Sequence, residues 1–211
     1  MTDGTVSVFR RKRGAILAAQ IADLAKRHGR PISIIDVGGR RDYWNNVGFA
    51  NIQHITLVNI EESDLGRTSA FGDKFSDLIG DARSLPEFGD KGFDLYHSNS
   101  VIEHVGGWAD MQAMADEARR IGRSGWVQTP AWGFPVEPHF RLPAMHWFAT
   151  PLRASMLRLA RHYRSLNHSQ RRLHAERINL LSRRETRILF PDCEIMTERL
   201  MLLGKSFVVR W

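Results

Sequence analysis

The stretch Ile32-Ser33-Ile34-Ile35-Asp36-Val37-Gly38-Gly39-Arg40 predicts a buried strand and the loop that follows it. Isoleucines dominate its first half, an acid comes near the end, and two adjacent glycines follow. Such apolar runs are typical of parallel strands buried on both faces, and glycines let the backbone approach a ligand closely. Open α/β sheets bind ligands at the carboxyl ends of their strands. The stretch therefore predicts a site for a nucleotide-like ligand after Val37.

The spacing of the glycines argues against two common phosphate-binding loops. A dinucleotide-binding loop needs G-x-G-x-x-G, but Arg40, Arg41 and Asp42 follow the glycine pair here. No G-x-x-x-x-G-K-[ST] loop occurs either. An acid two residues before the first glycine suits a ligand that carries hydroxyls and a positive charge. S-adenosylmethionine, with its ammonium and sulfonium groups, is such a ligand.

Composition predicts one soluble domain. The chain has 211 residues and is 43% hydrophobic, which is enough for one sizeable core. The single cysteine, Cys193, excludes an internal disulfide and fits a reducing compartment. Leu17, Ile21 and Leu24 repeat at helical spacing and predict an amphipathic helix over residues 12–28. No apolar run approaches the length that spans a bilayer, so we expect a cytoplasmic protein.

The net charge of +7 is concentrated in one region. Its arginines are Arg153, Arg158, Arg161, Arg164, Arg171, Arg172, Arg177, Arg183, Arg184 and Arg187. This pattern is typical of a solvated helical face, and its functional alternatives are an anionic acceptor or an anionic membrane surface. A nucleic-acid partner is disfavoured, because no reader motif and no basic stripe interleaved with aromatics is present.

Strand-like and helical patterns alternate along the chain, which favours a mostly parallel sheet with helices on both faces. The expected strands are Ile32–Val37, Ile55–Ile60, Leu78–Gly80, Phe93–Ser98, Gly125–Thr129, Glu194–Leu202 and Lys205–Trp211. The last two flank only Leu203 and Gly204, so they predict an antiparallel hairpin.

Three further helices are expected. The first covers Trp108–Ile121 and ends at Gly122, a common helix stop. The second follows apolar residues at helical spacing, namely Leu152, Met156, Leu159, Tyr163 and Leu166. The third begins at the capping box of Ser182 and Glu185 and ends before Pro191.

Small and polar residues follow four of the expected strands. Asp36, Gly38 and Gly39 follow the first, and alternation puts Asn59 and Glu61 on one face at the end of the second. Either of those two side chains suits ribose hydroxyls, because both follow the first acid by the interval that nucleotide folds use. The other two loops contain Gly80-Asp81-Ala82, whose carboxylate suits an exocyclic amine, and Ser98-Asn99-Ser100.

The four motifs, in this order, resemble those of class I S-adenosylmethionine-dependent methyltransferases. They read Asp-Val-Gly-Gly, Leu-Val-Asn-Ile-Glu, Gly-Asp-Ala-Arg-Ser-Leu-Pro, and the run from Phe93 to Val105. The C-terminal hairpin is similar to the reversed seventh strand of that family. The resemblance implies a Rossmann-like sheet of seven strands and S-adenosyl-L-methionine as cofactor. This sequence departs from the family at Asn59, where an acid is usual, and at Arg40, where a third glycine is usual.

The resemblance also assigns cofactor contacts. Asp36 and the glycine pair Gly38-Gly39 would border the methionine end, and Asn59 or Glu61 would bind the ribose. Asp81 and Ala82 would contact the adenine, and Ser98 the inner edge of the cofactor.

An acceptor hydroxyl would need a base, and three residues after the fourth and fifth strands are candidates. They are His104, His139 and Glu137, with His139 as the first choice and His104 as its rival. By contrast, we expect His97, His146 and His162 to be structural or exposed. The histidines and Cys193 lack the spacing of a zinc site, so no metal is expected.

We predict one methyltransferase domain over residues 1–211, with an inserted lid over residues 130–181 that holds the acceptor. The acceptor is expected to be a small molecule or a glycan- or lipid-linked compound. Two alternatives stay open: an NAD(P)-dependent oxidoreductase, and a non-catalytic binding module on the same fold.

Overall fold

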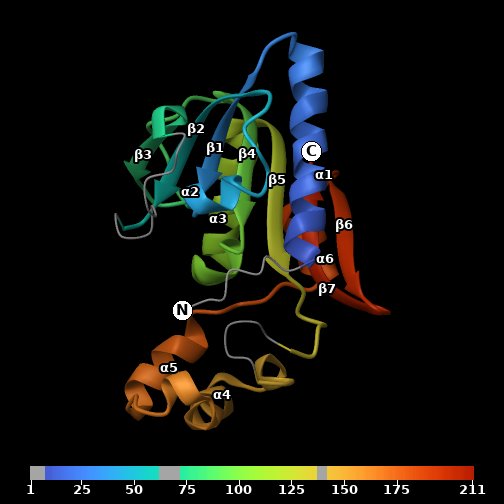
Figure 1. The fold of residues 1–211 in the computed structure, drawn as a ribbon. Coiled ribbons are helices and arrows are strands. Elements are labelled where there is room, and N and C mark those ends of the chain that lie inside the picture. The colour runs from blue at the N-terminus through green and yellow to red at the C-terminus, as the bar shows by residue number, and fades with distance from the viewer. Residues whose placement is uncertain (1–7, 62–71, 137–141) are drawn as a thin grey trace. The chain divides into compact units, whose positions relative to one another are not determined.

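The structure is a computed structural model that describes residues 8–61, 72–136 and 142–211. Seven strands form one sheet in the order β3-β2-β1-β4-β5-β7-β6 (Figure 1). They are β1 (Ile32–Val37), β2 (Ile52–Asn59), β3 (Phe75–Ile79), β4 (Phe93–Asn99), β5 (Gly122–Pro130), β6 (Glu194–Leu200) and β7 (Leu203–Arg210). Strand β1 pairs in parallel with β2 and β4, β2 pairs in parallel with β3, and β6 and β7 are antiparallel. The predicted Rossmann-like fold class is confirmed.

The helices lie between and after these strands. The α-helices are α1 (Val8–His28), α2 (Arg41–Trp44), α3 (Trp108–Ile121), α4 (Thr150–Met156), α5 (His168–Glu176) and α6 (Arg183–Leu189). The short 3-10 helices are η2 (Gly72–Lys74), η3 (Ile102–His104), η4 (Met145–Trp147), η5 (Leu157–Leu159) and η6 (Arg161–Tyr163). Among the helices of the described residues, none has the length and apolar character needed to cross a membrane.

The chain divides into two compact units. Unit 1 comprises Met1–Asn99 and Glu117–Trp126, and unit 2 comprises Ser100–Asp116 and Val127–Trp211. Helix α3 and strand β5 therefore each have one end in unit 1 and the other end in unit 2.

Unit 1 is built around β1, whose isoleucines are buried. Ile34 and Ile35 are both inaccessible to solvent, which is why this strand tolerates apolar residues on both of its faces. Helix α1 buries Leu17, Ile21 and Leu24, the residues whose spacing predicted it. It ends at His28, and Gly29 follows with a φ of 66°, a conformation that favours glycine after a helix.

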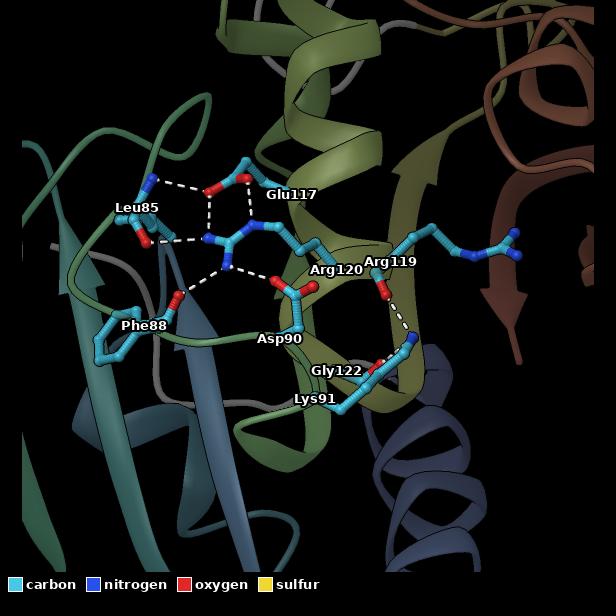
Figure 2. Close-up of polar contacts among 8 residues, drawn as sticks. All are labelled: Leu85, Phe88, Asp90, Lys91, Glu117, Arg119, Arg120 and Gly122. Atoms are coloured by element: carbon cyan, nitrogen blue, oxygen red, sulfur yellow. Dashed lines mark hydrogen bonds and ion pairs between the residues drawn. The ribbon is translucent and has the colours of Figure 1, made fainter.

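A hydrogen-bonded cluster ties the loop before β4 to the end of α3 (Figure 2). The Arg120 guanidinium donates to both carboxylate oxygens of Glu117, at 2.7 and 2.9 Å, and to the backbone carbonyls of Leu85 and Phe88. Glu117 in turn accepts the backbone N–H of Leu85 at 2.8 Å. The hydrogen bonds from Arg120 hold the pKa of Glu117 below its usual range. Asp90 completes the cluster through an ion pair with Arg120.

Unit 2 has a small core beneath α4 and α5, which Figure 1 draws in orange. The buried residues of this core are Met145, Ala154, Leu157, Ala175 and Ile178. Helix α6 begins at Ser182 with both hydrogen bonds of the predicted capping box. Cys193, which precedes β6, is 3% exposed and forms no disulfide.

The helix predicted from Leu152 to Leu166 is wrong in extent. Helix α4 ends at Met156, two 3-10 helices follow, and the extended backbone of Ala160 separates them. The buried side of this segment is formed by Ala154 and Leu157, whereas Leu159 of the predicted apolar stripe is 63% exposed. The apolar stripe therefore predicted the wrong face, because Ala154 and Leu157, which do not belong to it, pack on the core.

Two turn predictions also need correction. Gly122 does not stop α3 with a loop but begins β5 directly, and a Cβ there would lie 2.6 Å from the Cβ of Tyr96. In the hairpin the turn lies at Met201-Leu202, not at Leu203-Gly204. Gly204 pairs with Arg199 inside the ladder, next to a register shift, which is where strand glycines are often found.

Candidate functional site

The glycine loop of unit 1 follows β1 at the carboxyl edge of the parallel strands. Gly38 has a φ of 72°, a region that L side chains rarely adopt, and its N–H donates to the carbonyl of Val58 at 2.7 Å. Gly39 packs against Asp36, because a Cβ at Gly39 would lie 1.8 Å from the Asp36 carboxylate. Gly38 is therefore required by its backbone conformation and Gly39 by its contact with Asp36, whereas their predicted approach to a ligand stays a prediction.

Asp36 is the centre of a buried polar network. Its Oδ2 accepts from the indole nitrogen of Trp44 at 2.7 Å, and its Oδ1 lies 2.6 Å from Nδ1 of His97. All three side chains are at most 1% exposed. Nε2 of His97 lies 3.3 Å from the hydroxyl of Tyr43. Asp36 thus fixes α2 and β4 beside the glycine loop, and its predicted contact with the cofactor stays a prediction.

Three members of this network were not predicted as site residues from the sequence, namely Tyr43, Trp44 and His97. Tyr43 and Trp44 lie on a helix of only four residues, too short to give a periodic signal. His97 was expected to be structural or exposed, and the structure shows that it is structural and buried. The parallel register that pairs Asp36 with His97 is the feature that joins them.

Asn59 and Glu61 differ in their surroundings. The side-chain amide of Asn59 donates to the carbonyl of Gly39 at 2.9 Å, so the end of β2 holds the glycine loop from its other side. Asn59 is 6% exposed. Glu61 lies just beyond β2 and is exposed. Of the two ribose candidates, Asn59 has the structural contact and Glu61 has the accessible carboxylate.

Asp81 and Ala82 follow β3, as predicted. The Asp81 carboxylate accepts both the backbone N–H and the guanidinium of Arg83, and these hydrogen bonds hold the pKa of Asp81 below its usual range. Ala82 is buried, and a bridge between Asp81 and Ser84 closes the turn. The carboxylate is therefore ionised and fixed in place.

Ser98 lies near the end of β4 and is fully buried. Its hydroxyl has no hydrogen-bond partner among the residues that the structure describes. The next residue, Asn99, accepts from the guanidinium of Arg13 on α1 at 2.6 Å. Buried hydroxyls are normally hydrogen-bonded. Because the Ser98 hydroxyl has no such partner, it can still form one more hydrogen bond.

A cavity of about 230 Å³ lies against the glycine loop within unit 1. Its lining residues are Arg10, Arg13, Asp36, Gly38, Gly39, Arg40, Asp42, Tyr43, Asn46, His97 and Asn99. Arginines and carboxylates both line it, which suits a zwitterionic ligand such as an α-amino acid group. Asp36 and the two glycines are the predicted site residues that line it.

Of the three base candidates, His104 lies among the residues that the structure describes. His104 is exposed and ends η3, outside the residues that line either cavity described here. His139 and Glu137 lie outside the described residues. Among the residues that are described, no group of three or more histidine, cysteine, aspartate or glutamate side chains is arranged to hold a metal ion.

Unit 2 contains a second and larger cavity, of about 310 Å³. Its lining residues are Gly107, Trp108, Met111, Trp132, His146, Arg153, Ile178, Asn179, Leu180, Leu181 and Glu185. Most of them come from the segment over residues 130–181 that the sequence predicted to hold an acceptor. His146, expected to be structural or exposed, is 7% exposed and lines this cavity.

Comparisons with known proteins agree with the fold. Residues 37–126 match the model of a methyltransferase domain family. The N-terminal domain of EvdMO1, crystallised with SAH and D-fucose, aligns with 99% of this chain and 84% of its own, at 15% identity and a TM-score of 0.58. The SAH-bound magnesium protoporphyrin IX methyltransferase of Synechocystis PCC 6803 aligns with 99% of this chain and 88% of its own, at 13% identity and a TM-score of 0.55.

The N-methyltransferase NodS of Bradyrhizobium japonicum WM9 covers 97% of this chain and 97% of its own, at 10% identity and a TM-score of 0.54. Some matched structures are longer than this chain. The chain covers only 56% of the length of the structure from Nostoc punctiforme PCC 73102. No curated protein matches the sequence. Residues 37–126 thus match a methyltransferase domain, a match that implies S-adenosyl-L-methionine as cofactor, and the solved structures share the fold of this chain.

Proposed function

We propose that this protein transfers a methyl group from S-adenosylmethionine to a small-molecule or glycan- or lipid-linked acceptor. The observation that carries the proposal is the cavity at the Gly38-Gly39 loop, at the carboxyl edge of β1 and β4. This cavity is lined by two glycines that expose their backbone, by three arginines and by the fixed carboxylate of Asp36. The two glycines lie in the segment that matches the methyltransferase domain family.

The residues around this cavity fit the methionine end of the cofactor. Its carboxylate would pair with Arg10, Arg13 or Arg40, and its ammonium with Asp42 or with lone pairs of Asp36 that the network leaves over. The orphaned hydroxyl of Ser98 supports the predicted contact with the inner edge of the cofactor. Asn59 or Glu61 remains the proposed partner of the ribose, and Asp81 and Ala82 remain the proposed partners of the adenine.

When bound, S-adenosylmethionine supplies a methyl group that is already activated by its sulfonium. The protein therefore contributes chiefly proximity and alignment for an in-line displacement, with a base if the acceptor is a hydroxyl. The glycine loop is held on one side by Val58 and on the other by Asn59, so its backbone is preorganised. His139, Glu137 and His104 remain proposed bases.

The oxidoreductase alternative would need a pyrophosphate at a helix N-terminus after G-x-G-x-x-G. Helix α2 follows the glycine pair but begins with Arg41 and Asp42, and no third glycine precedes it. The binding-module alternative would retain the fold without transferring a methyl group.

Isothermal titration calorimetry with S-adenosylhomocysteine, S-adenosylmethionine and NAD separates these alternatives. We expect micromolar binding of the first two ligands and none of NAD. Incubation with S-adenosylmethionine and a cell extract should then give a product heavier by one CH₂, detected by mass spectrometry. Binding of NAD alone would support the oxidoreductase. Binding of S-adenosylhomocysteine with no methylated product from any extract would favour the binding module.

A further inference from the structure

His146 lines the unit 2 cavity with one ring nitrogen hydrogen-bonded and the other without a partner among the described residues. Nε2 lies 2.8 Å from the backbone carbonyl of Trp132. A carbonyl only accepts hydrogen bonds, so Nε2 must carry the proton. In the neutral ring, Nδ1 therefore holds a lone pair. It is buried and has no hydrogen-bond partner among the residues that the structure describes.

The position of this imidazole is fixed by its neighbours. The carbonyl of Trp132 also accepts from the indole nitrogen of Trp147, at 2.9 Å, so both of its lone pairs are used. The ring centroid of Trp147 lies 5.3 Å from that of His146. Turning the imidazole over would break the bond to Trp132 and leave a buried carbonyl with one partner fewer. Nδ1 is thus presented in one defined orientation.

Three other polar side chains of the cavity have protein partners. Arg153 donates to the carbonyl of Ile178 and to the hydroxyl of Thr150. Asn179 donates to the carbonyl of Gly106 at 2.9 Å, and Glu185 accepts the backbone N–H of Ser182. Nδ1 of His146 is the buried acceptor of this lining that has no hydrogen-bond partner among the described residues.

The rest of the lining is apolar and aromatic. Met111, Ile178 and Leu181 are buried, whereas Trp108 and Trp132 are each 45% exposed. Exposed indole faces stack against flat rings, both aromatic rings and the apolar faces of sugars. A ligand for this cavity therefore combines a flat ring with at least one hydrogen-bond donor.

We propose that the unit 2 cavity binds the acceptor as a hydroxylated ring whose hydroxyl donates to Nδ1 of His146. This inference rests on the proposed methyltransferase function and deepens it by naming the acceptor class.

The first test measures binding without cofactor, using three probes. Phenol and methyl α-D-glucopyranoside carry a hydroxyl on an aromatic and a saturated ring, and toluene matches phenol without the hydroxyl. With histidine labelled with ¹⁵N, we expect phenol or the glucoside at millimolar concentration to shift the Nδ1 resonance of His146, and toluene to leave it unchanged. Which hydroxylated probe binds identifies the ring type. If neither binds, or if toluene binds as tightly as phenol, the inference is wrong.

The second test uses His146→Gln, whose side-chain amide can still donate to the carbonyl of Trp132 but lacks the imidazole lone pair. We expect it to bind the hydroxylated probe about tenfold more weakly, the loss of roughly one buried hydrogen bond. The matched control is His162→Gln, at an exposed histidine of the same unit, which should bind normally. Equal affinities for the two variants would contradict the role of Nδ1.

The two proposals fail in different ways. S-adenosylhomocysteine binding is measured on the same samples by calorimetry. If it binds while neither hydroxylated probe does, the acceptor inference fails and the proposed function stands. If the probes bind but S-adenosylhomocysteine does not, the proposed function fails.

Discussion

A carboxylate at the end of a strand can fix the neighbouring loop through hydrogen bonds as well as face a ligand. Asp36 shows this, because it accepts from Trp44 and His97 while it lines the unit 1 cavity. Both neighbours would be left with buried, unpartnered nitrogens without it, which is costly. The sequence predicted only a contact between Asp36 and a ligand, which stays a prediction, and did not indicate the hydrogen bonds to Trp44 and His97.

The glycine at position 38 gives the first prediction at this scale. Gly38→Ala forces a side chain into a left-handed conformation, so we expect the free energy of unfolding to fall by about 1–2 kcal/mol. Urea denaturation monitored by circular dichroism measures this change. The matched control is Gly89→Ala, because Gly89 has no positive φ and no atom within 4 Å of a built Cβ. Equal losses in the two variants would contradict the conformational argument.

Single elements were predicted well where periodicity and burial agree. Strand β1 and helix α3 have the predicted bounds, because β1 is a short apolar run buried on both faces and the apolar residues of α3 repeat at helical spacing and are buried. Helix α6 was found from its capping box. Helix α5 was missed, although Asn167 and Gln170 form the same kind of box, because arginines surround it and its apolar residues are few.

The cluster of Figure 2 gives a prediction at the scale of elements, since Arg120 and Glu117 join α3 to the loop before β4. The pKa of Glu117 is lowered in the folded protein by its hydrogen bonds to Arg120. Its stabilising effect is therefore fully present above the unfolded pKa of about 4.3 and is lost as the pH falls through the folded value.

Glu117→Gln should consequently lower the free energy of unfolding by about 1 kcal/mol at pH 7, a value reduced for partial exposure. The difference from the unchanged protein should shrink as the pH falls below about 4. Urea titrations over a range of pH measure it. Glu176→Gln is the control, because its ion pair with Arg172 is largely exposed and contributes little. A difference that stays constant with pH would contradict the assignment.

At the scale of the whole molecule, charge and exposed apolar residues coincide. Trp147, Phe148, Leu152 and Leu159 are 43–63% exposed, and Arg158 and Arg161 lie beside the last of them in sequence. Exposed apolar side chains flanked by cations are typical of surfaces that bind anionic membranes. We therefore propose peripheral membrane contact through this region of unit 2, which would bring a lipid-linked acceptor within reach.

Cosedimentation with phosphatidylserine–phosphatidylcholine vesicles tests this proposal. We expect the protein to sediment at low salt and to be released between about 50 and 500 mM salt, as the Debye length shortens. Reversing both charges in Arg158→Glu/Arg161→Glu should weaken binding by about tenfold or more. Lys26→Glu/Arg27→Glu makes the same charge change at exposed positions of α1 and should have a smaller effect. If both pairs weaken binding equally, net charge alone is responsible.

The candidate site was predictable where it follows from local sequence and not where it depends on tertiary contacts. The glycine loop and the order of the strand-end motifs are local, and Gly38 needed no structure to be identified. The bond between Asp36 and His97 joins residues far apart in the chain, and only the pairing of β1 with β4 brings them together. The proposed role of His146 likewise depends on its hydrogen bond to the carbonyl of Trp132, and no spacing in the sequence indicates that bond.

Because its single cysteine is buried, this protein is well suited to site-directed labelling through an introduced cysteine. Cys193 is 3% exposed, so maleimide reagents will react with it slowly in the native state. A cysteine introduced at an exposed position next to the unit 1 cavity, such as Asn45, becomes the readily modified sulfhydryl. A fluorophore attached there would report ligand entry in real time without prior removal of the native cysteine.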